Sequence, residues 1–248
     1  MILLGASNVT LGFGVLTRLI RHGFAGPLDV RAALGHGRSY GAWSTVVARS
    51  LPPIATCGLW ESLQTPTPVR TYALLTDVGN DLMYGFSPEQ IAGWVATCLD
   101  RLCELDAKIV VTRLPIARVE QLGSFRYHAT RMSFFPRHQP ISWSEMLRRA
   151  RELDDRTHEA AVKCGASVLT PPIEWYGFDP IHIRWTRRAS AWDEVLSKWS
   201  DYQRSSRGLP SQGLPLLGRF PERMRLFGRE RETTQPVATR GDMTLSLY

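Results

Sequence analysis

Cysteine is scarce in this sequence, and the few cysteines are not spaced as pairs. Cys57, Cys98, Cys103 and Cys164 are scattered along 248 residues and form no C-x-x-C motif. This distribution excludes a fold held together by closely spaced disulfides. It favours thiols that serve as small buried hydrophobic groups.

Long apolar runs are also missing. No stretch of about 18 uncharged apolar residues occurs, which excludes a membrane-spanning helix. The first residues lack a basic segment, an apolar run and a small-residue cleavage site in succession, so no signal peptide is visible. As written, the chain is expected to be cytoplasmic, although a start site upstream of Met1 would leave room for an export signal.

The histidines do not form a metal-binding pattern, and the charge is not concentrated. Most histidines have no ligand-like spacing to one another or to cysteine, so neither a metal site nor a cofactor is expected. These residues are His22, His36, His128, His138 and His158. The formal net charge of +7 comes mainly from arginine spread along the chain. It predicts only weak, salt-dependent attraction to anions and no specific nucleic-acid partner.

The apolar segments that are present alternate between short β-like runs and longer amphipathic runs. With 44% hydrophobic residues, the chain can bury one full core. The alternation predicts an α/β fold with a parallel sheet and helices on its faces. The predicted strands are residues 2–4, 28–34, 69–76, 108–114 and 166–170, and the predicted helices are 87–104, 142–165 and 187–199.

The composition changes after residue 200. Glycine, proline and serine are dense in a linker-like stretch, so we expect a domain at 1–200 and an extension at 201–248. Two alternating runs, Met224 to Phe227 and Met243 to Tyr248, predict a β-hairpin with each other. The other reading is an arginine-rich tail without regular structure, since an isolated hairpin is marginally stable. The extension also offers a surface for homo-oligomer formation.

Two serines follow predicted strands in glycine-containing turns. Ser39 in GHGRSYG matches the G-x-S-x-G nucleophile elbow of α/β-hydrolases. That elbow normally follows several strands of a large sheet, whereas at most two strands precede Ser39. Ser7 in GASN follows the first strand and opens a helix, where backbone N–H groups point towards a ligand. Ser7 is therefore the stronger candidate nucleophile.

Possible partners for Ser7 lie near the end of the predicted sheet. Asp179 and His182 are three residues apart after the last strand, so one loop can supply a base and the carboxylate that orients it. Loops after the first and last parallel strands open at the same edge of the sheet, where ligands bind. Candidate donors to an oxyanion are the N–H of Ser7, the N–H of Gly37 and the side-chain amide of Asn80.

Together these segments resemble four sequence blocks of the SGNH, or GDSL-like, hydrolases. The blocks are GASN at 5–8, GHGRS at 35–39, GND at 79–81 and DPIH at 179–182. The resemblance implies a flavodoxin-like, three-layer doubly wound sandwich with a five-stranded parallel sheet in the order 2-1-3-4-5. It also implies cleavage of a small-molecule or carbohydrate ester through an acyl-serine, without metal or cofactor. By position, Ser7, His182 and Asp179 form the triad, and Ser7, Gly37 and Asn80 form the oxyanion hole.

The sequence also departs from the family pattern. Ala6 stands where the family usually has aspartate, and Ile183 and Arg184 follow the histidine where proline and asparagine are frequent. Two alternatives therefore stay open: an acyltransferase with the same residues, and a catalytically inactive binding protein on the same fold. Residues 115–141 are expected to help build the pocket, but they do not identify the acyl group or the alcohol.

Overall fold

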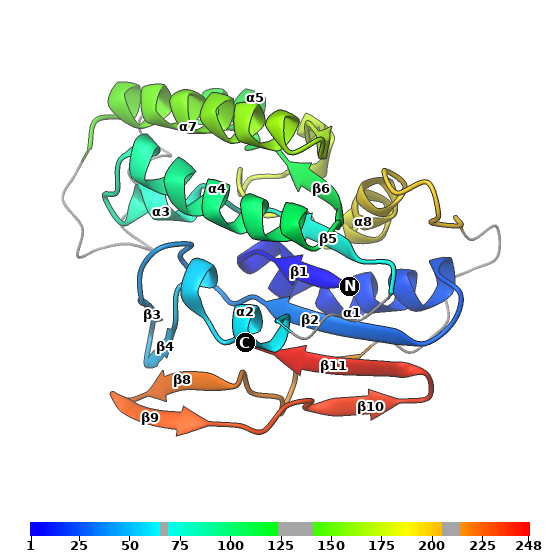
Figure 1. The fold of residues 1–248 in the computed structure, drawn as a ribbon. Helices are drawn as coiled ribbons and strands as arrows, with labels where there is room; N and C mark the ends of the chain where they lie inside the picture. The colour runs from blue at the N-terminus through cyan, green and yellow to red at the C-terminus, as the bar shows by residue number, and fades with distance from the viewer. Residues whose placement is uncertain (65–68, 124–140, 205–213) are drawn as a thin grey trace.

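A computed structural model describes residues 1–64, 69–123, 141–204 and 214–248. Its centre is a mostly parallel sheet with helices on both faces, and a small antiparallel sheet lies beside it (Figure 1). The larger sheet contains β1 (Ile2–Leu4), β2 (Leu28–Ala33), β5 (Tyr72–Leu75), β6 (Lys108–Thr112), β7 (Ser167–Leu169), β10 (Ala238–Arg240) and β11 (Met243–Leu247). The smaller sheet contains β3 (Ser44–Val46), β4 (Arg49–Leu51), β8 (Arg223–Leu226) and β9 (Arg229–Glu232).

The helices connect these strands in a largely alternating order. The longer ones are α1 (Ser7–Gly23), α4 (Pro88–Glu104), α7 (Trp143–Lys163) and α8 (Arg188–Leu196). The shorter ones are α2 (Leu59–Ser62), α3 (Asn80–Met83) and α5 (Ile116–Glu120), together with single 3-10 turns at Ile54–Thr56 and Ile173–Trp175. None of the described helices combines the length and apolar content that crossing a bilayer requires.

The order of the larger sheet is β10-β11-β2-β1-β5-β6-β7. All neighbouring pairs are parallel except β10 with β11. The five predicted strands are present and follow one another as β2-β1-β5-β6-β7, but the predicted count of five is wrong. Two further strands, β10 and β11, extend the sheet beyond β2, and they come from the segment after residue 200.

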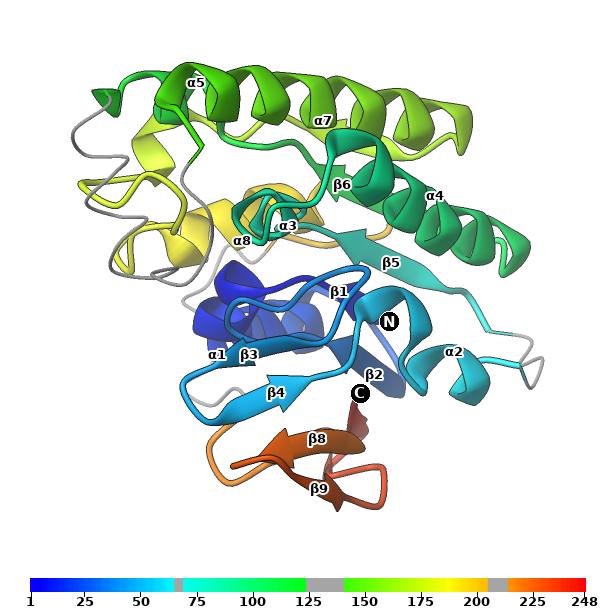
Figure 2. The same ribbon diagram turned by 90° about the vertical axis from the view of Figure 1, so that its left-hand side faces the viewer.

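The short central strand β1 contributes side chains to the hydrophobic cores on both faces of the sheet. β1 has only three residues, and it pairs with β2 on one side and β5 on the other. Ile2 and Leu4 pack towards α4 and α7, whereas Leu3 packs towards α1 and α8. Successive side chains of a strand point to opposite faces, so three apolar residues serve two cores. Figures 1 and 2 show α4 and α7 together on one side of the sheet.

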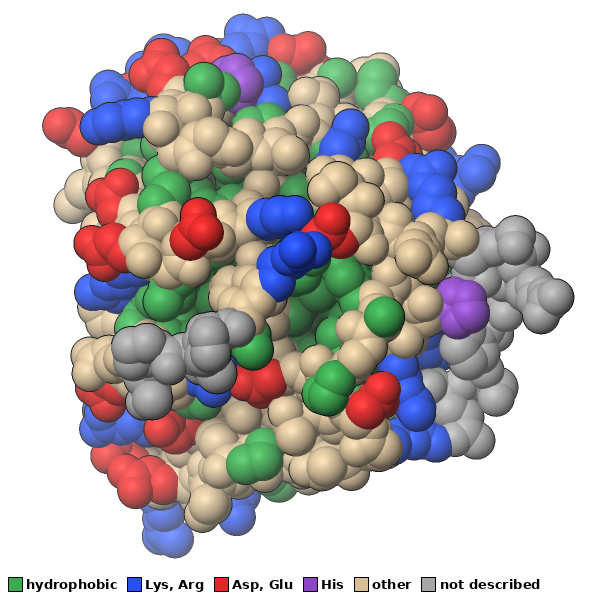
Figure 3. Space-filling model, turned by 45° about the vertical axis from the view of Figure 1, so that its right-hand side comes forward, with side chains coloured by type: hydrophobic (Ala, Val, Ile, Leu, Met, Phe, Trp, Pro, Cys, Tyr) green, Lys and Arg blue, Asp and Glu red, His purple; other side chains and the backbone are tan. Residues whose placement is uncertain are grey.

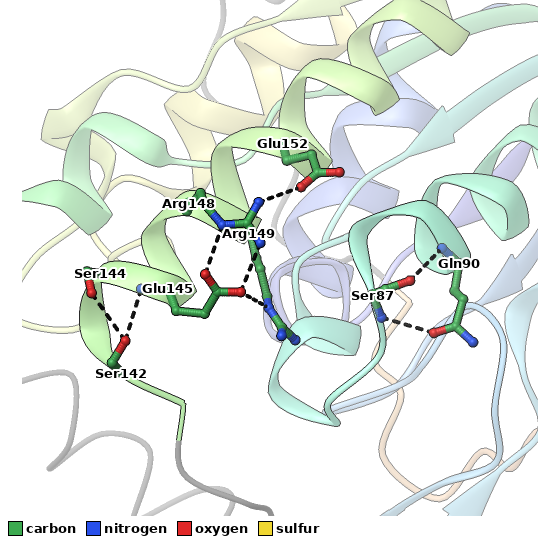
Figure 4. Close-up of polar contacts among 8 residues, drawn as sticks. All are labelled: Ser87, Gln90, Ser142, Ser144, Glu145, Arg148, Arg149 and Glu152. Atoms are coloured by element: carbon green, nitrogen blue, oxygen red, sulfur yellow. Dashed lines mark hydrogen bonds and ion pairs between the residues drawn. The ribbon is translucent and has the colours of Figure 1, made fainter.

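Two predicted helix starts are confirmed. Ser87 accepts a hydrogen bond from the Gln90 N–H at 3.2 Å, and the Gln90 side chain accepts one from the Ser87 N–H at 3.0 Å. This reciprocal capping box opens α4 (Figure 4). At α7, Ser142 caps the Glu145 N–H, but the Glu145 carboxylate pairs with Arg148 and Arg149 instead of the cap (Figure 4).

The predicted hairpin between residues 224–227 and 243–248 is not formed. β8 instead pairs with β9 through a two-residue turn, Phe227–Gly228, in which both φ angles are positive. β8 also pairs with β4, and β11 lies parallel to β2 within the larger sheet. Each run forms a local hairpin, β8 with β9 and β11 with β10, and each also pairs with a strand far away in sequence. These sheet contacts supply the support that an isolated hairpin lacks.

Surface charges of both signs are mixed. On the face drawn in Figure 3, Lys and Arg side chains lie interspersed with Asp and Glu. Asp201 is an example, because its carboxylate accepts hydrogen bonds from Arg70 at 3.0 Å and Lys108 at 2.8 Å. Neighbouring acidic groups thus offset part of the positive charge of Lys and Arg.

Candidate active site

Ser7, His182 and Asp179 are joined by consecutive hydrogen bonds. His182 Nε2 lies 2.8 Å from Ser7 Oγ, and His182 Nδ1 lies 2.5 Å from Asp179 Oδ2. Ser7 is the first residue of α1 and follows β1, whereas the other two residues follow β7. Because β1 and β7 run in the same direction, their following loops lie at one edge of the sheet. The predicted spatial meeting of these three residues is therefore present.

The loop that carries His182 is held in shape by its own carboxylate. Asp179 Oδ1 accepts hydrogen bonds from the backbone N–H groups of Ile181 at 3.0 Å and His182 at 3.2 Å. An antiparallel bridge between Tyr176 and Ile183 closes the base of the loop. Partial burial raises the pKa of Asp179, but these hydrogen bonds and that from the His182 ring outweigh it and leave the pKa below its usual value. Asp179 is therefore ionised at neutral pH.

An aspartate that sequence reasoning missed shapes the Ser7 turn. Asp77 Oδ2 accepts hydrogen bonds from the N–H groups of Ala6 and Asn8, both at 2.9 Å. It follows β5 in a left-handed backbone conformation, φ +62°, which is uncommon outside glycine. The resemblance implies a carboxylate within the turn at position 6; here a carboxylate from the neighbouring strand bonds to that turn instead. The only sequence signal was an acidic residue directly after a predicted strand.

Asn8 links the Ser7 turn to the histidine loop. Its side-chain nitrogen donates to Asp77 Oδ1 at 2.8 Å and to the Ile181 carbonyl at 2.9 Å. Its side-chain oxygen accepts from the Ile183 N–H at 2.8 Å. Asn8 thus bonds to the backbone on both sides of His182, which restricts where the imidazole can lie relative to Ser7.

Two of the three predicted oxyanion donors lie at a shared cavity. Ser7 and Asn80 both line a cavity of about 150 Å³. The Asn80 side-chain nitrogen is buried and has no hydrogen-bond partner among the described residues. The Ser7 N–H also donates to no described residue, although both neighbouring N–H groups are bound by Asp77. A buried donor without a partner costs free energy, and a bound oxyanion at this cavity would supply the missing acceptor.

Gly37, the third predicted donor, belongs to a turn near His182 but is not among the residues that line this cavity. Gly37 has a φ of +61°, in the left-handed region that favours glycine. A Cβ added here would lie 2.7 Å from Val46 and 2.9 Å from Tyr84, which also favours glycine. Partial burial lowers the pKa of the adjacent His36, and the charges of Arg49 and His182 lower it further. The turn thus lies within electrostatic reach of the triad.

Ser39 has a different environment. It is fully buried, and its hydroxyl donates to Asp81 and accepts from the N–H groups of Gly41 at 3.1 Å and Ala42 at 2.9 Å. Burial raises the pKa of Asp81 to about 6, although the hydrogen bonds from Ser39 and from the Tyr40 N–H oppose this. Ser39 therefore closes its own turn and bonds to a carboxylate rather than to an imidazole, so the structure does not support Ser39 as the serine of a nucleophile elbow.

No family model matches the chain, and no curated protein matches it in sequence. Among solved structures, it is similar to the psychrotrophic esterase EstA from Pseudoalteromonas sp., with 10% identity over 81% of this chain and 98% of that chain and a TM-score of 0.48. It is also similar to the M. smegmatis aryl esterase, with 13% identity over 79% of this chain and 96% of that chain and a TM-score of 0.48. A third protein, from Slackia heliotrinireducens and provisionally assigned to the SGNH hydrolases, has 16% identity over 79% of this chain and 96% of that chain and a TM-score of 0.43. These low identities and TM-scores do not by themselves indicate an activity for this chain.

The arrangement at this edge of the sheet suits nucleophilic chemistry. A hydroxyl touches an imidazole, an ionised carboxylate bonds to the other ring nitrogen, and unpartnered N–H donors lie at the same cavity. These parts are what activation of a serine and stabilisation of an oxyanion require. The predicted specificity loop, residues 115–141, lies largely outside the described residues.

Proposed function

We propose that this chain is an SGNH-type serine hydrolase that cleaves carboxylic esters. The observation that carries the proposal is the hydrogen-bonded chain Ser7–His182–Asp179, assembled from residues 175 positions apart. The four ordered sequence blocks support the same assignment, as does the pair of unpartnered donors, the Ser7 N–H and the Asn80 side-chain amide.

In the proposed acylation step, His182 Nε2 takes the proton of Ser7 while Ser7 Oγ bonds to the ester carbonyl carbon. The carbonyl oxygen becomes an oxyanion that accepts hydrogen bonds from the Ser7 N–H, the Asn80 amide and the Gly37 N–H. The bond to the alcohol oxygen then breaks, and the leaving alcohol takes the proton from His182. Asp179, with its lowered pKa, stays ionised and holds the imidazole in the tautomer that can accept at Nε2.

In the deacylation step, His182 takes a proton from water, whose oxygen bonds to the carbonyl carbon of acyl-Ser7. The acyl–Oγ bond breaks, Ser7 recovers its proton from His182, and the acid leaves. The same donors stabilise the second oxyanion, and the net reaction consumes one water and one ester.

Two assays test the proposal. The wild type is expected to hydrolyse p-nitrophenyl esters and to react with a fluorophosphonate probe, with the adduct on Ser7 by mass spectrometry. Ser7→Ala is expected to lose both, whereas Ser39→Ala, the matched control, is expected to keep both. A folded wild type that neither reacts with the probe nor exceeds the Ser7→Ala rate contradicts the proposal and favours the inactive binding protein. Product that forms only with an added alcohol favours the acyltransferase.

A further inference from the structure

The cavity beside Ser7 has mostly apolar walls. Side chains from α3, α5, α7 and the loops after β6 and β7 surround it. Its apolar lining residues include Leu82, Leu114, Ile116, Met146, Ala150 and Trp175. Ser7 and Asn80 belong to the same lining, so a group bonded to Ser7 Oγ has direct access to this space.

Several polar side chains in the lining are already bound to other protein groups, whereas the Asn80 amide nitrogen and the Trp192 indole nitrogen have no partner among the described residues. The Thr76 and Thr112 hydroxyls bond to each other. Arg113 donates to Asp154 at 2.9 Å and to Asp155 at 3.2 Å. Asn8 is bound on three sides, as described above. A hydroxyl-rich group placed here would lose more hydrogen bonds to water than the Asn80 and Trp192 nitrogens could replace, whereas an apolar group has none to lose.

The volume limits the size of the occupant. The cavity measures about 150 Å³, and a dry, apolar protein cavity of roughly that size accepts benzene. The matching ligand therefore has an apolar part of about six carbons. An acetyl group would leave most of the space empty, and a long fatty acyl chain would exceed it.

We propose that this cavity is the acyl-binding pocket and that the preferred substrates are esters of medium-length apolar acids, hexanoyl or an aromatic equivalent such as benzoyl. This inference rests on the proposed function, because it needs the carbonyl carbon to lie at Ser7. The alcohol part of the ester then lies outside this pocket. The pocket thus selects the acid and leaves the alcohol to other surfaces.

The test is a series of p-nitrophenyl esters from acetyl to dodecanoyl, with kcat/KM measured for each. We expect kcat/KM to rise about fourfold for each methylene that enters the pocket, up to hexanoyl, and to fall beyond octanoyl. A series that is flat or declines from acetyl onwards, while hydrolysis still requires Ser7, overturns the pocket assignment and leaves the proposed function standing. If the folded wild type shows neither Ser7-dependent hydrolysis nor labelling of Ser7, both the pocket assignment and the proposed function are overturned.

Variants of the pocket wall make the test specific. Ala150→Leu on α7 adds three carbons to the lining and is expected to lower the ratio of hexanoyl to acetyl kcat/KM roughly tenfold or more. Ala160→Leu is the matched control, since it adds the same volume on the same helix, away from the cavity, and is expected to leave the ratio unchanged.

Met146→Ala supplies an opposite readout in case Ala150→Leu does not fold. Met146 is buried in the same wall, and its truncation enlarges the cavity. The optimum is expected to move from hexanoyl towards decanoyl. An unchanged optimum in a folded Met146→Ala protein, with thermal unfolding as the check on folding, overturns the assignment.

Discussion

Two serine turns of this protein look alike in sequence and differ in what surrounds them. Both follow neighbouring parallel strands, β1 and β2, and both contain a nearly inaccessible serine: Ser7 is 6% exposed and Ser39 is 0% exposed. The Ser7 hydroxyl contacts an imidazole, whereas the Ser39 hydroxyl contacts a carboxylate and two backbone N–H groups.

The difference shows that partners, not the local motif, decide the chemistry of a buried serine. Ser39 has the closer match to a nucleophile motif, yet its oxygen is committed to the hydrogen bonds of its own turn. Ser7 lies where a loop from the far end of the chain arrives with a base. The following predictions test this contrast, from the largest expected effect on activity to the smallest.

Removing the negative charge behind the imidazole is expected to have the largest effect. Asp179→Asn keeps the shape of the side chain but favours the wrong tautomer of His182, so kcat is expected to fall about 10⁴-fold. Steady-state hydrolysis of p-nitrophenyl hexanoate measures this. Ser39→Ala is the control and is expected to keep kcat within about threefold, because a surface or structural hydroxyl away from the reacting atoms does not enter the barrier. Equal losses in both variants would remove the distinction between the two turns.

Asn80→Ala is expected to lower kcat about 10²- to 10³-fold, the usual cost of losing one oxyanion donor. The unpartnered amide of Asn80 makes no structural hydrogen bond to a described residue through its nitrogen, so the melting temperature is expected to change little. A variant with normal kcat would show that Asn80 is not a donor to the oxyanion.

Asn8→Ala is expected to lower kcat about 10- to 100-fold, because His182 loses its fixed position relative to Ser7. The Ser7 hydroxyl itself is untouched, so phosphonate labelling is expected to slow by a similar factor without being lost. Asn8→Asp keeps the acceptor for the Ile183 N–H but places a carboxylate against Asp77, and it is expected to be no better than Asn8→Ala. Unchanged labelling rates in both variants would contradict a positioning role.

The Ser39 turn is expected to affect stability rather than rate, and in a pH-dependent way. Burial raises the pKa of Asp81 from 3.8 to about 6, so the folded state binds this proton more tightly than the unfolded state. The resulting stabilisation, about 3 kcal/mol, is complete below about pH 4 and is lost as the pH rises through about 6. Denaturant unfolding from pH 4 to 7 measures the slope, and Asp81→Asn is expected to flatten it. An identical slope in that variant would show that other groups cause it.

Much of the fold could be predicted from local pattern. Five strands and the starts of α4 and α7 follow from apolar periodicity and capping residues, which act within a few positions of the chain. The candidate triad could be named because Ser7 follows the first predicted strand, and Asp179 and His182 follow the last. These segments also resemble family blocks in the family's order. Asp77 and Asn8 could not, because their hydrogen bonds span 68 to 175 positions and neither side chain differs locally from an ordinary turn residue.

The C-terminal strands illustrate the opposite difficulty. Residues 224–227 and 243–248 alternate between apolar and polar side chains, as strands do. This alternation does not indicate which strand each run pairs with. Besides their local hairpins, the first run pairs with β4 and the second with β2, and these distant partners are fixed only by the assembled sheets. The buried Arg38 joins these regions, since its guanidinium donates to the Pro52 carbonyl and to the backbone oxygen of Tyr248.

The position of β11 has a consequence for synthesis. A hydrogen bond from Thr244 to Asp29 joins residues 215 positions apart, so β2 emerges from the ribosome long before the strand that covers its outer edge. During that interval the edge is open to pairing with other chains. A chaperone that holds the nascent chain until β11 has been made is therefore expected to raise the yield of folded protein.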